Sequence, residues 1–142
     1  MTVPFFDNGP TRLYQADARK IPLPDESVHM VCTSPPYFGL RTYKGVGQGA
    51  IGLEATVEDY IANLVGVFRE VHRVLRGDGI CWLNMGESRG RGAHDGAGSA
   101  KQDTNRGSNT PGPGGKSDGN RLGIPERVVL ALQSDGWIWR DT

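Results

Sequence analysis

The sequence is poor in the features that most directly point to a class of protein. Its 142 residues include only two cysteines, Cys32 and Cys81, with no CxxC motif and no cluster of Cys and His. This scarcity argues against a structural zinc site, and we expect no metal. Both cysteines stand in apolar runs, which predicts small, buried side chains.

Long apolar runs and an excess of charge are also missing. No stretch approaches the roughly eighteen apolar residues that a membrane span needs, and the start "MTVPFFDNGP" lacks the pattern of a signal peptide. We therefore expect a soluble, cytoplasmic protein without a membrane partner. Sixteen basic residues balance sixteen acidic ones, so any polyanionic partner would need a local basic patch.

A strand, a helix and a second strand are predicted between residues 27 and 86. "SVHMVCTS" is a mostly apolar run bounded by turn signals. Residues 56–75 repeat apolar side chains at three- and four-residue spacing, with Thr56 as N-cap, Asp59 three residues later, and Gly77 or Gly79 as the end. "GICWLNMG" predicts the second strand. This order favours a parallel pair joined by a crossover helix.

The flanking segments have simpler signals. "TRLYQADA" predicts a short strand that ends near Asp17. Eleven of the 21 glycines fall between Gly86 and Gly123, so we expect a flexible insertion that has too little apolar surface to fold alone. "GIPERVVLALQSDG" predicts a helix with Pro125 in its first turn, and "WIWRDT" predicts the start of another strand.

Residues 32–39, "CTSPPYFG", place two prolines directly after the first apolar strand. Each proline fixes its own φ at about −65° and has no N–H to donate, so the pair makes a stiff corner. Ligands of open parallel sheets bind beyond the carboxyl ends of the strands, where this corner lies. Ser34, a proline carbonyl and the ring of Tyr37 would suit an exocyclic amino group on a flat base. A rigid turn without a catalytic role is the alternative.

Three stretches together resemble the amino-group DNA methyltransferases, which use S-adenosylmethionine. They are "LYQADARKIPLPDESVHMVCTSPPYFGLRTY", "GQGAIGLEATVEDYIANLVGVFREVHRVLRGDGICWLNMGES" and "GNRLGIPERVVLALQSDGWIWRDT". The family's catalytic motif is Asp, Asn or Ser followed by Pro-Pro and an aromatic residue. The resemblance implies an α/β fold, here a partial Rossmann-like methyltransferase fold with a mainly parallel sheet and flanking helices.

The resemblance also implies roles for individual residues. Ser34 and the Pro35 carbonyl would bind the target amine, with Pro36 completing the motif, and Tyr37 would stack on a base flipped out of double-stranded DNA. Serine at the first position is mainly associated with N4 of cytosine, and N6 of adenine is the alternative. Asp17 would contact the adenine of the methyl donor, or would only form a turn.

Two further segments offer basic side chains for DNA. Arg41 and Lys44 lie in a glycine-rich loop after the corner, where they would contact phosphates or remain solvated. Residues 88–121 have six basic residues against three acidic ones, which would suit DNA contact or a solvated linker. The six are Arg89, Arg91, Lys101, Arg106, Lys116 and Arg121.

The family's donor-binding loop, FxGxG, does not occur in this sequence. In one permuted class of the family, the catalytic motif precedes the donor loop. We therefore expect residues 1–87 to be the catalytic part of the domain, 88–122 an insertion, and 123–142 a continuation that is truncated before the donor loop. The missing C-terminal half would be a partner. A fragment that binds DNA or a partner without catalysis is the remaining alternative.

Overall fold

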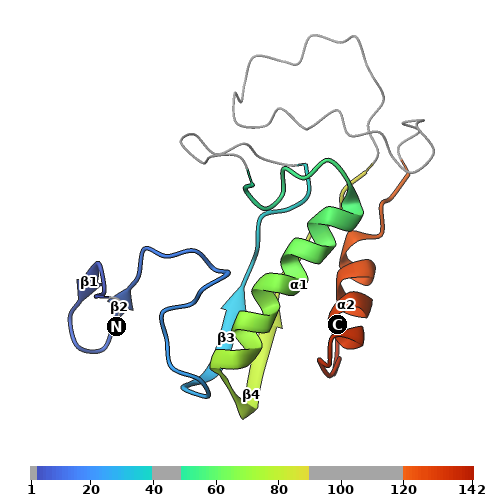
Figure 1. Ribbon diagram of the computed structural model, residues 1–142. Helices are drawn as coiled ribbons and strands as arrows, with labels where there is room; N and C mark the ends of the chain where they lie inside the picture. The colour runs from blue at the N-terminus through green and yellow to red at the C-terminus, as the bar shows by residue number, and fades with distance from the viewer. Residues whose placement is uncertain (1–2, 40–48, 90–119) are drawn as a thin grey trace. The chain divides into compact units, whose positions relative to one another are not determined.

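The computed structural model describes residues 3–39, 49–89 and 120–142, which contain two short sheets and two helices (Figure 1). The elements follow in the order β1 (Phe6–Asp7), β2 (Arg12–Leu13), β3 (Val28–Thr33), α1 (Val57–Val74), β4 (Leu75–Leu83) and α2 (Ile124–Ser134). The chain divides into two compact units, and α1 runs through both. One unit is Met1–Thr33 with Gly66–Trp82, and the other is Ser34–Val65 with Leu83–Thr142.

The predicted strand–helix–strand order is confirmed. Strands β3 and β4 are hydrogen-bonded neighbours, and their arrows point the same way in Figure 1. Helix α1 connects them, as a parallel pair requires. The N–H groups of Glu26 and Ser27 donate to the carbonyls of Arg73 and Val74 at 3.0 and 2.9 Å, so the entry to β3 is fixed to the end of α1.

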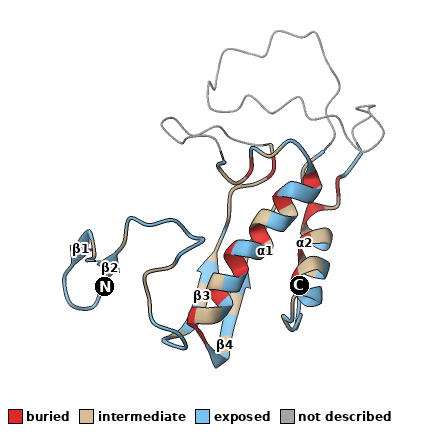
Figure 2. Ribbon diagram, viewed as in Figure 1, coloured by how far each residue is buried: buried red, intermediate tan, exposed pale blue. Residues whose placement is uncertain are grey.

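Helix α1 begins where the sequence predicted. The Thr56 hydroxyl donates to the Asp59 carboxylate at 2.6 Å and accepts from the Asp59 N–H at 3.1 Å, which is a capping interaction. The apolar face is buried along the whole helix (Figure 2). Its buried members are Val57, Tyr60, Leu64, Val67, Phe68, Val71 and Val74.

The predicted last residue of α1, 75, lies one position from the observed end, but the predicted glycine cap was wrong. The helix stops at Val74 and β4 starts at Leu75, so Gly77 and Gly79 lie inside the strand. The physical reason lies in the last helical carbonyls, those of Arg73 and Val74. They accept from the N–H groups of Glu26 and Ser27, so no glycine cap is needed to satisfy them.

The strand predicted to end near Asp17 is also wrong. Strand β2 covers only Arg12–Leu13 and pairs in antiparallel fashion with β1, with Phe6 opposite Leu13 and Asp7 opposite Arg12. The hairpin turns through Gly9, whose φ of 90° favours glycine. Residues beyond Leu13 leave this ladder, so Asp17 stands in irregular chain.

The predicted helix with Pro125 in its first turn is confirmed as α2. Pro125 occupies the first turn, and Ile124, Val128 and Leu132 are buried. The N–H of Gly136 donates to Gln133 at 3.1 Å and that of Trp137 to Leu132 at 3.1 Å, which is the Schellman arrangement.

Two other expectations are corrected. Residues 137–142 form no strand, and the described strands pair only as β1 with β2 and β3 with β4. Cys32 is exposed rather than buried, on β3, whose Met30 is also exposed. No described helix is long and apolar enough to span a membrane.

Candidate active site

The SPPY corner (Ser34–Tyr37) directly follows the last residue of β3, as predicted. Ser34 is exposed, and Pro35, Pro36 and Tyr37 are half-buried. The Ser34 hydroxyl donates to the Tyr37 hydroxyl at 3.3 Å, so the two side chains that the sequence singled out lie together.

The segment after β4 packs against the same corner. A Cβ added at Gly86 would lie 2.6 Å from Tyr37 Cε2 and 2.9 Å from Cδ2, so only glycine fits beside this ring. Two residues later, the Ser88 hydroxyl donates to the Phe38 carbonyl at 2.8 Å. The chain beyond β4 therefore supports both the ring of Tyr37 and the residue that follows it.

Helix α1 and the loop before it support the corner from another direction. The Tyr60 hydroxyl donates to the Pro36 carbonyl at 2.8 Å, and its ring centroid lies 5.4 Å from that of Phe38. A Cβ added at Gly52 would lie 3.0 Å from the Tyr37 carbonyl oxygen. Residues 52–60 and residues 86–88, which are distant in sequence, thus meet at residues 36–38.

Glu54 ties this loop to α1. Its carboxylate accepts from the N–H of Gly52 at 2.8 Å and from the side-chain amide of Asn63 at 2.9 Å. Burial raises the pKa of Tyr60, and the negative charge of Glu54 raises it further. The Tyr60 hydroxyl therefore keeps its proton at neutral pH and remains a donor.

Glu87 organises the start of α2. Its carboxylate accepts from the N–H groups of Ser88 and Ile124, at 2.8 and 3.3 Å, and from the guanidinium of Arg121 at 3.1 Å. Burial raises the pKa of Glu87, but these hydrogen bonds outweigh it and hold the pKa below its ordinary value. Leu122 N–H also donates to the Ser88 carbonyl at 2.9 Å, so both ends of the glycine-rich segment meet here.

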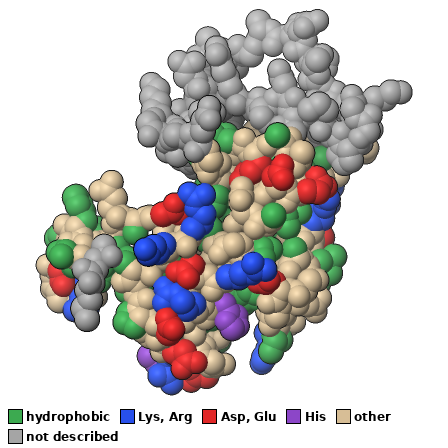
Figure 3. Space-filling model, in the orientation of Figure 1, with side chains coloured by type: hydrophobic (Ala, Val, Ile, Leu, Met, Phe, Trp, Pro, Cys, Tyr) green, Lys and Arg blue, Asp and Glu red, His purple; other side chains and the backbone are tan. Residues whose placement is uncertain are grey.

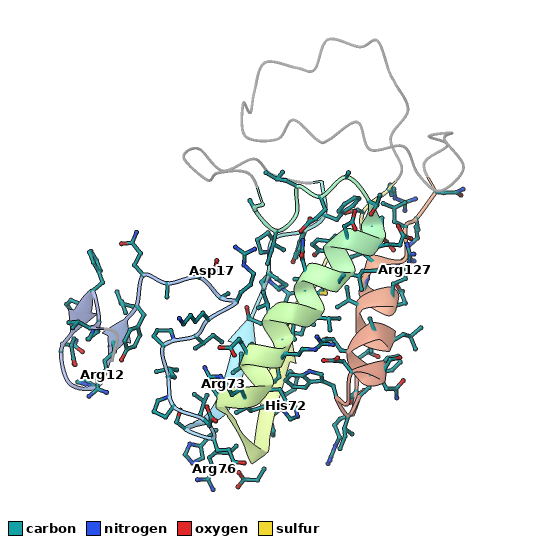
Figure 4. All side chains as sticks on the ribbon, viewed as in Figure 1. Arg12, Asp17, His72, Arg73, Arg76 and Arg127 are labelled. Carbon is teal, nitrogen blue, oxygen red and sulfur yellow. The ribbon has the colours of Figure 1, made fainter. Side chains whose placement is uncertain are left out.

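Asp17, the predicted donor contact, belongs to the other unit. It is exposed, and its carboxylate accepts three hydrogen bonds of 2.6 to 3.1 Å from the Arg19 guanidinium (Figure 4). The bonds from Arg19 lower the pKa of Asp17 to about 2. The residue lines a cleft of about 510 Å³ together with Ala16, Lys20, Ile21, Pro22, Glu70 and Arg73. A ligand there would meet a carboxylate that stays ionised.

Arg41, Lys44 and most of the predicted insertion lie outside the described residues. Of the six basic residues predicted between 88 and 121, Arg89 and Arg121 are described, and they form an isolated antiparallel bridge. Figure 3 shows Lys and Arg side chains interspersed with Asp and Glu on the visible face, rather than gathered in a patch of one sign.

No group of three or more potential metal ligands occurs in the described part of the chain. Cys81 is half-buried, and burial followed by the charge of Cys32 raises its pKa to about 11. A thiol in that state is a poor nucleophile at neutral pH.

The sequence did not reveal the residues that hold the corner. The apolar spacing of residues 56–75 includes Tyr60 but does not indicate the partner that a buried tyrosine hydroxyl usually needs. Gly86, Ser88 and Glu87 stood at the edge of the glycine-rich segment, where nothing in the sequence sets them apart. The contacts of Gly86 with Tyr37 and of Ser88 with Phe38 span about fifty positions and arise only in the folded chain.

Comparison with known proteins assigns the family. The signature of the N6/N4 methyltransferase family, described as DNA methylase, matches residues 28–142. The chain is 43% identical over 125 residues to the Type II methyltransferase M.SmaI of Serratia marcescens, covering 83% of this chain and 40% of the relative. It is 46% identical over 115 residues to M.SfiI of Streptomyces fimbriatus, covering 81% and 24%.

A third relative extends the match. M.Cfr9I of Citrobacter freundii is 39% identical over 140 residues, covering 94% of this chain and 45% of the relative. The chain thus spans less than half the length of each of these three relatives. No solved structure matches. The extent of the family match and these identities show that the chain belongs to the N6/N4 family of DNA methyltransferases.

Proposed function

We propose that this chain carries the catalytic corner of a DNA methyltransferase that moves a methyl group from S-adenosylmethionine to N4 of cytosine. The observation that carries the proposal is the pair formed by exposed Ser34 and half-buried Tyr37, joined by a hydrogen bond of 3.3 Å directly after β3. The serine at the first motif position favours cytosine. The enzyme would act in the cytoplasm as the modifying partner of a restriction system. Its relatives are named Type II methyltransferases.

The corner supplies acceptors and a flat surface. Ser34 and the Pro35 carbonyl accept hydrogen bonds from the target amine, while Tyr37 stacks on the flipped base. The nitrogen lone pair then attacks the methyl carbon. The methyl–sulfur bond breaks and leaves its electron pair on sulfur, which gives S-adenosylhomocysteine. The methylated nitrogen, now positively charged, releases a proton to solvent.

The methyl donor would also bind to a second part of the chain. The ionised carboxylate of Asp17 would accept hydrogen bonds from the exocyclic amine of the donor's adenine. The rest of the donor site, with its glycine-rich loop, would come from the remaining part of a longer, Rossmann-like methyltransferase domain. Arg41 and Lys44 would contact DNA phosphates.

The test uses labelled donor, genomic DNA and digestion to nucleosides. We assay the chain alone and a chimera in which it replaces the matching 45% of M.Cfr9I. We expect the chimera to produce N4-methylcytosine. Ser34→Ala in the same chimera should abolish this product. N6-methyladenine would establish the adenine alternative. A folded chimera that transfers no methyl group, beside an active M.Cfr9I, would overturn the proposal.

A further inference from the structure

Tyr60 brings a buried hydroxyl to the SPPY corner. It lies in the first turn of α1, its side chain is 0% exposed, and its hydroxyl donates to the Pro36 carbonyl at 2.8 Å. The backbone of Tyr60 is fixed in turn by its N–H bond to the Thr56 carbonyl at 3.2 Å. The donor thus comes from a rigid element rather than from a loop.

The position of that carbonyl determines the geometry of the corner. The rings of Pro35 and Pro36 fix both φ angles at about −65°. Pro35 also precedes a proline, which restricts its ψ to the extended region. The remaining soft rotation is ψ of Pro36, which orients the Pro36 carbonyl and the peptide plane leading to Tyr37. A hydrogen bond to this carbonyl therefore sets where Tyr37 stands relative to Ser34 and the Pro35 carbonyl.

Neighbouring contacts keep the Tyr60 hydroxyl in place. The rings of Tyr60 and Phe38 lie 5.4 Å apart at 47°. The Phe38 carbonyl is held separately by Ser88, at 2.8 Å. Because the carbonyls of residues 36 and 38 have different donors, loss of the Tyr60 hydroxyl would release the first while leaving the second in place.

We propose that Tyr60 is a positioning residue for methyl transfer, which acts by holding the Pro36 carbonyl so that Tyr37 faces the acceptors Ser34 and Pro35. This inference rests on the proposed function. Tyr60 itself does not contact the base or the donor. It acts through the backbone, and its removal changes the alignment of groups that do.

The test compares Tyr60→Phe with the control Tyr14→Phe, a half-buried tyrosine of the other unit. Both substitutions remove one hydroxyl and keep the ring. In the chain alone, we expect Tyr60→Phe to shift the amide resonances of Tyr37 and Phe38 and to increase their motion, with Tyr14→Phe leaving them unchanged. In the chimera, we expect kcat to fall by roughly 10- to 100-fold with KM for DNA unchanged, since misplacement mainly affects the reacting geometry.

Several results would overturn the inference. If Tyr60→Phe folds and the amide resonances of Tyr37 and Phe38 do not shift, the inference is wrong, whether or not the wild-type chimera is active. An active chimera whose kcat is unaffected by Tyr60→Phe would do so as well, whereas an inactive wild-type chimera would count against the proposed function instead. If Tyr60→Phe does not fold, the hydrogen bond is tested in the wild-type chain. The proton of the Tyr60 hydroxyl should exchange slowly with solvent, and rapid exchange would contradict the hydrogen bond.

Discussion

The ring of Tyr37 depends on the absence of a side chain at Gly86. A Cβ there would approach Cε2 to 2.6 Å, well inside contact distance, and an aromatic ring cannot bend away as a flexible chain can. We predict that Gly86→Ala displaces Tyr37 and breaks its hydrogen bond with Ser34. Methyl transfer by the chimera should fall, and the NMR resonances of the Tyr37 ring should shift.

Gly66 provides the matched control for this substitution. It lies within α1, and a Cβ added there would meet nothing within 4 Å. Alanine inside a helix is more stable than glycine by about 0.5–1 kcal/mol, so Gly66→Ala should raise the free energy of unfolding and spare activity. Equal activity of the two variants would show that the close approach of Gly86 to Tyr37 has no functional role.

Asp17 should titrate at unusually low pH. Its hydrogen bonds from Arg19 hold the pKa at about 2, against an ordinary value of 3.8. A lowered pKa means that this pair stabilises the fold above pH 3.8 and loses that effect as the pH falls through about 2. NMR of the Asp17 carboxyl carbon should give this midpoint, and Arg19→Ala should return it toward 3.8. A normal midpoint in the wild type would mean that the pair does not persist in solution.

At the scale of elements, Arg73 joins α1 to the chain that leads into β3. Its guanidinium donates to Glu70 and Asp25 at 2.9 and 2.5 Å, and to the carbonyls of Ile21 and Leu23 at 2.9 and 3.0 Å (Figure 4). Glu70 in turn accepts from the Ile21 N–H at 3.0 Å. A single side chain thus satisfies two carboxylates and two carbonyls.

A lysine cannot reproduce this planar arrangement of donors. We therefore predict that Arg73→Lys lowers the melting temperature and makes the Ile21 amide exchange faster with solvent. The control is Arg76→Lys, because Arg76 pairs with Asp78, two residues away, at 3.0 Å and both side chains are exposed. If the two variants have the same melting temperature, the Arg73 network does not hold residues 21–25 to α1.

Sequence periodicity predicted the elements better than their ends. The spacing of apolar residues and the Thr56 cap located α1, and the apolar runs located β3 and most of β4. The end of α1 was missed because its last carbonyls are satisfied by Glu26 and Ser27, which lie far away in sequence. The SPPY corner could be predicted because each proline restricts the backbone locally. Its support by Tyr60 and Ser88 could not, because these contacts depend on tertiary packing.

At the scale of the whole molecule, the family assignment has to be weighed against the short extent of the chain. The chain belongs to a family of DNA methyltransferases, yet it spans less than half the length of the relatives M.SmaI, M.SfiI and M.Cfr9I. Its described residues form two-stranded sheets only, and its sequence has no FxGxG loop. The residues proposed to bind the target base, Ser34 to Tyr37, are present in this sequence. The glycine-rich loop proposed to bind most of the methyl donor does not occur in it.

We predict that residues 1–142 bind S-adenosylmethionine weakly or not at all. In this type of fold, we attribute most donor affinity to the glycine-rich loop, where backbone amides approach the ligand closely. Asp17 would reach only one part of the donor. A tenfold loss of affinity corresponds to only about 1.4 kcal/mol, and the absence of a whole loop should cost several times as much. Calorimetric titration of the chain with the donor tests this directly, with the chimera as the binding-competent control. Micromolar binding to the chain alone would show that its own residues already form a donor site, and the cleft at Asp17 would then be the first place to mutate.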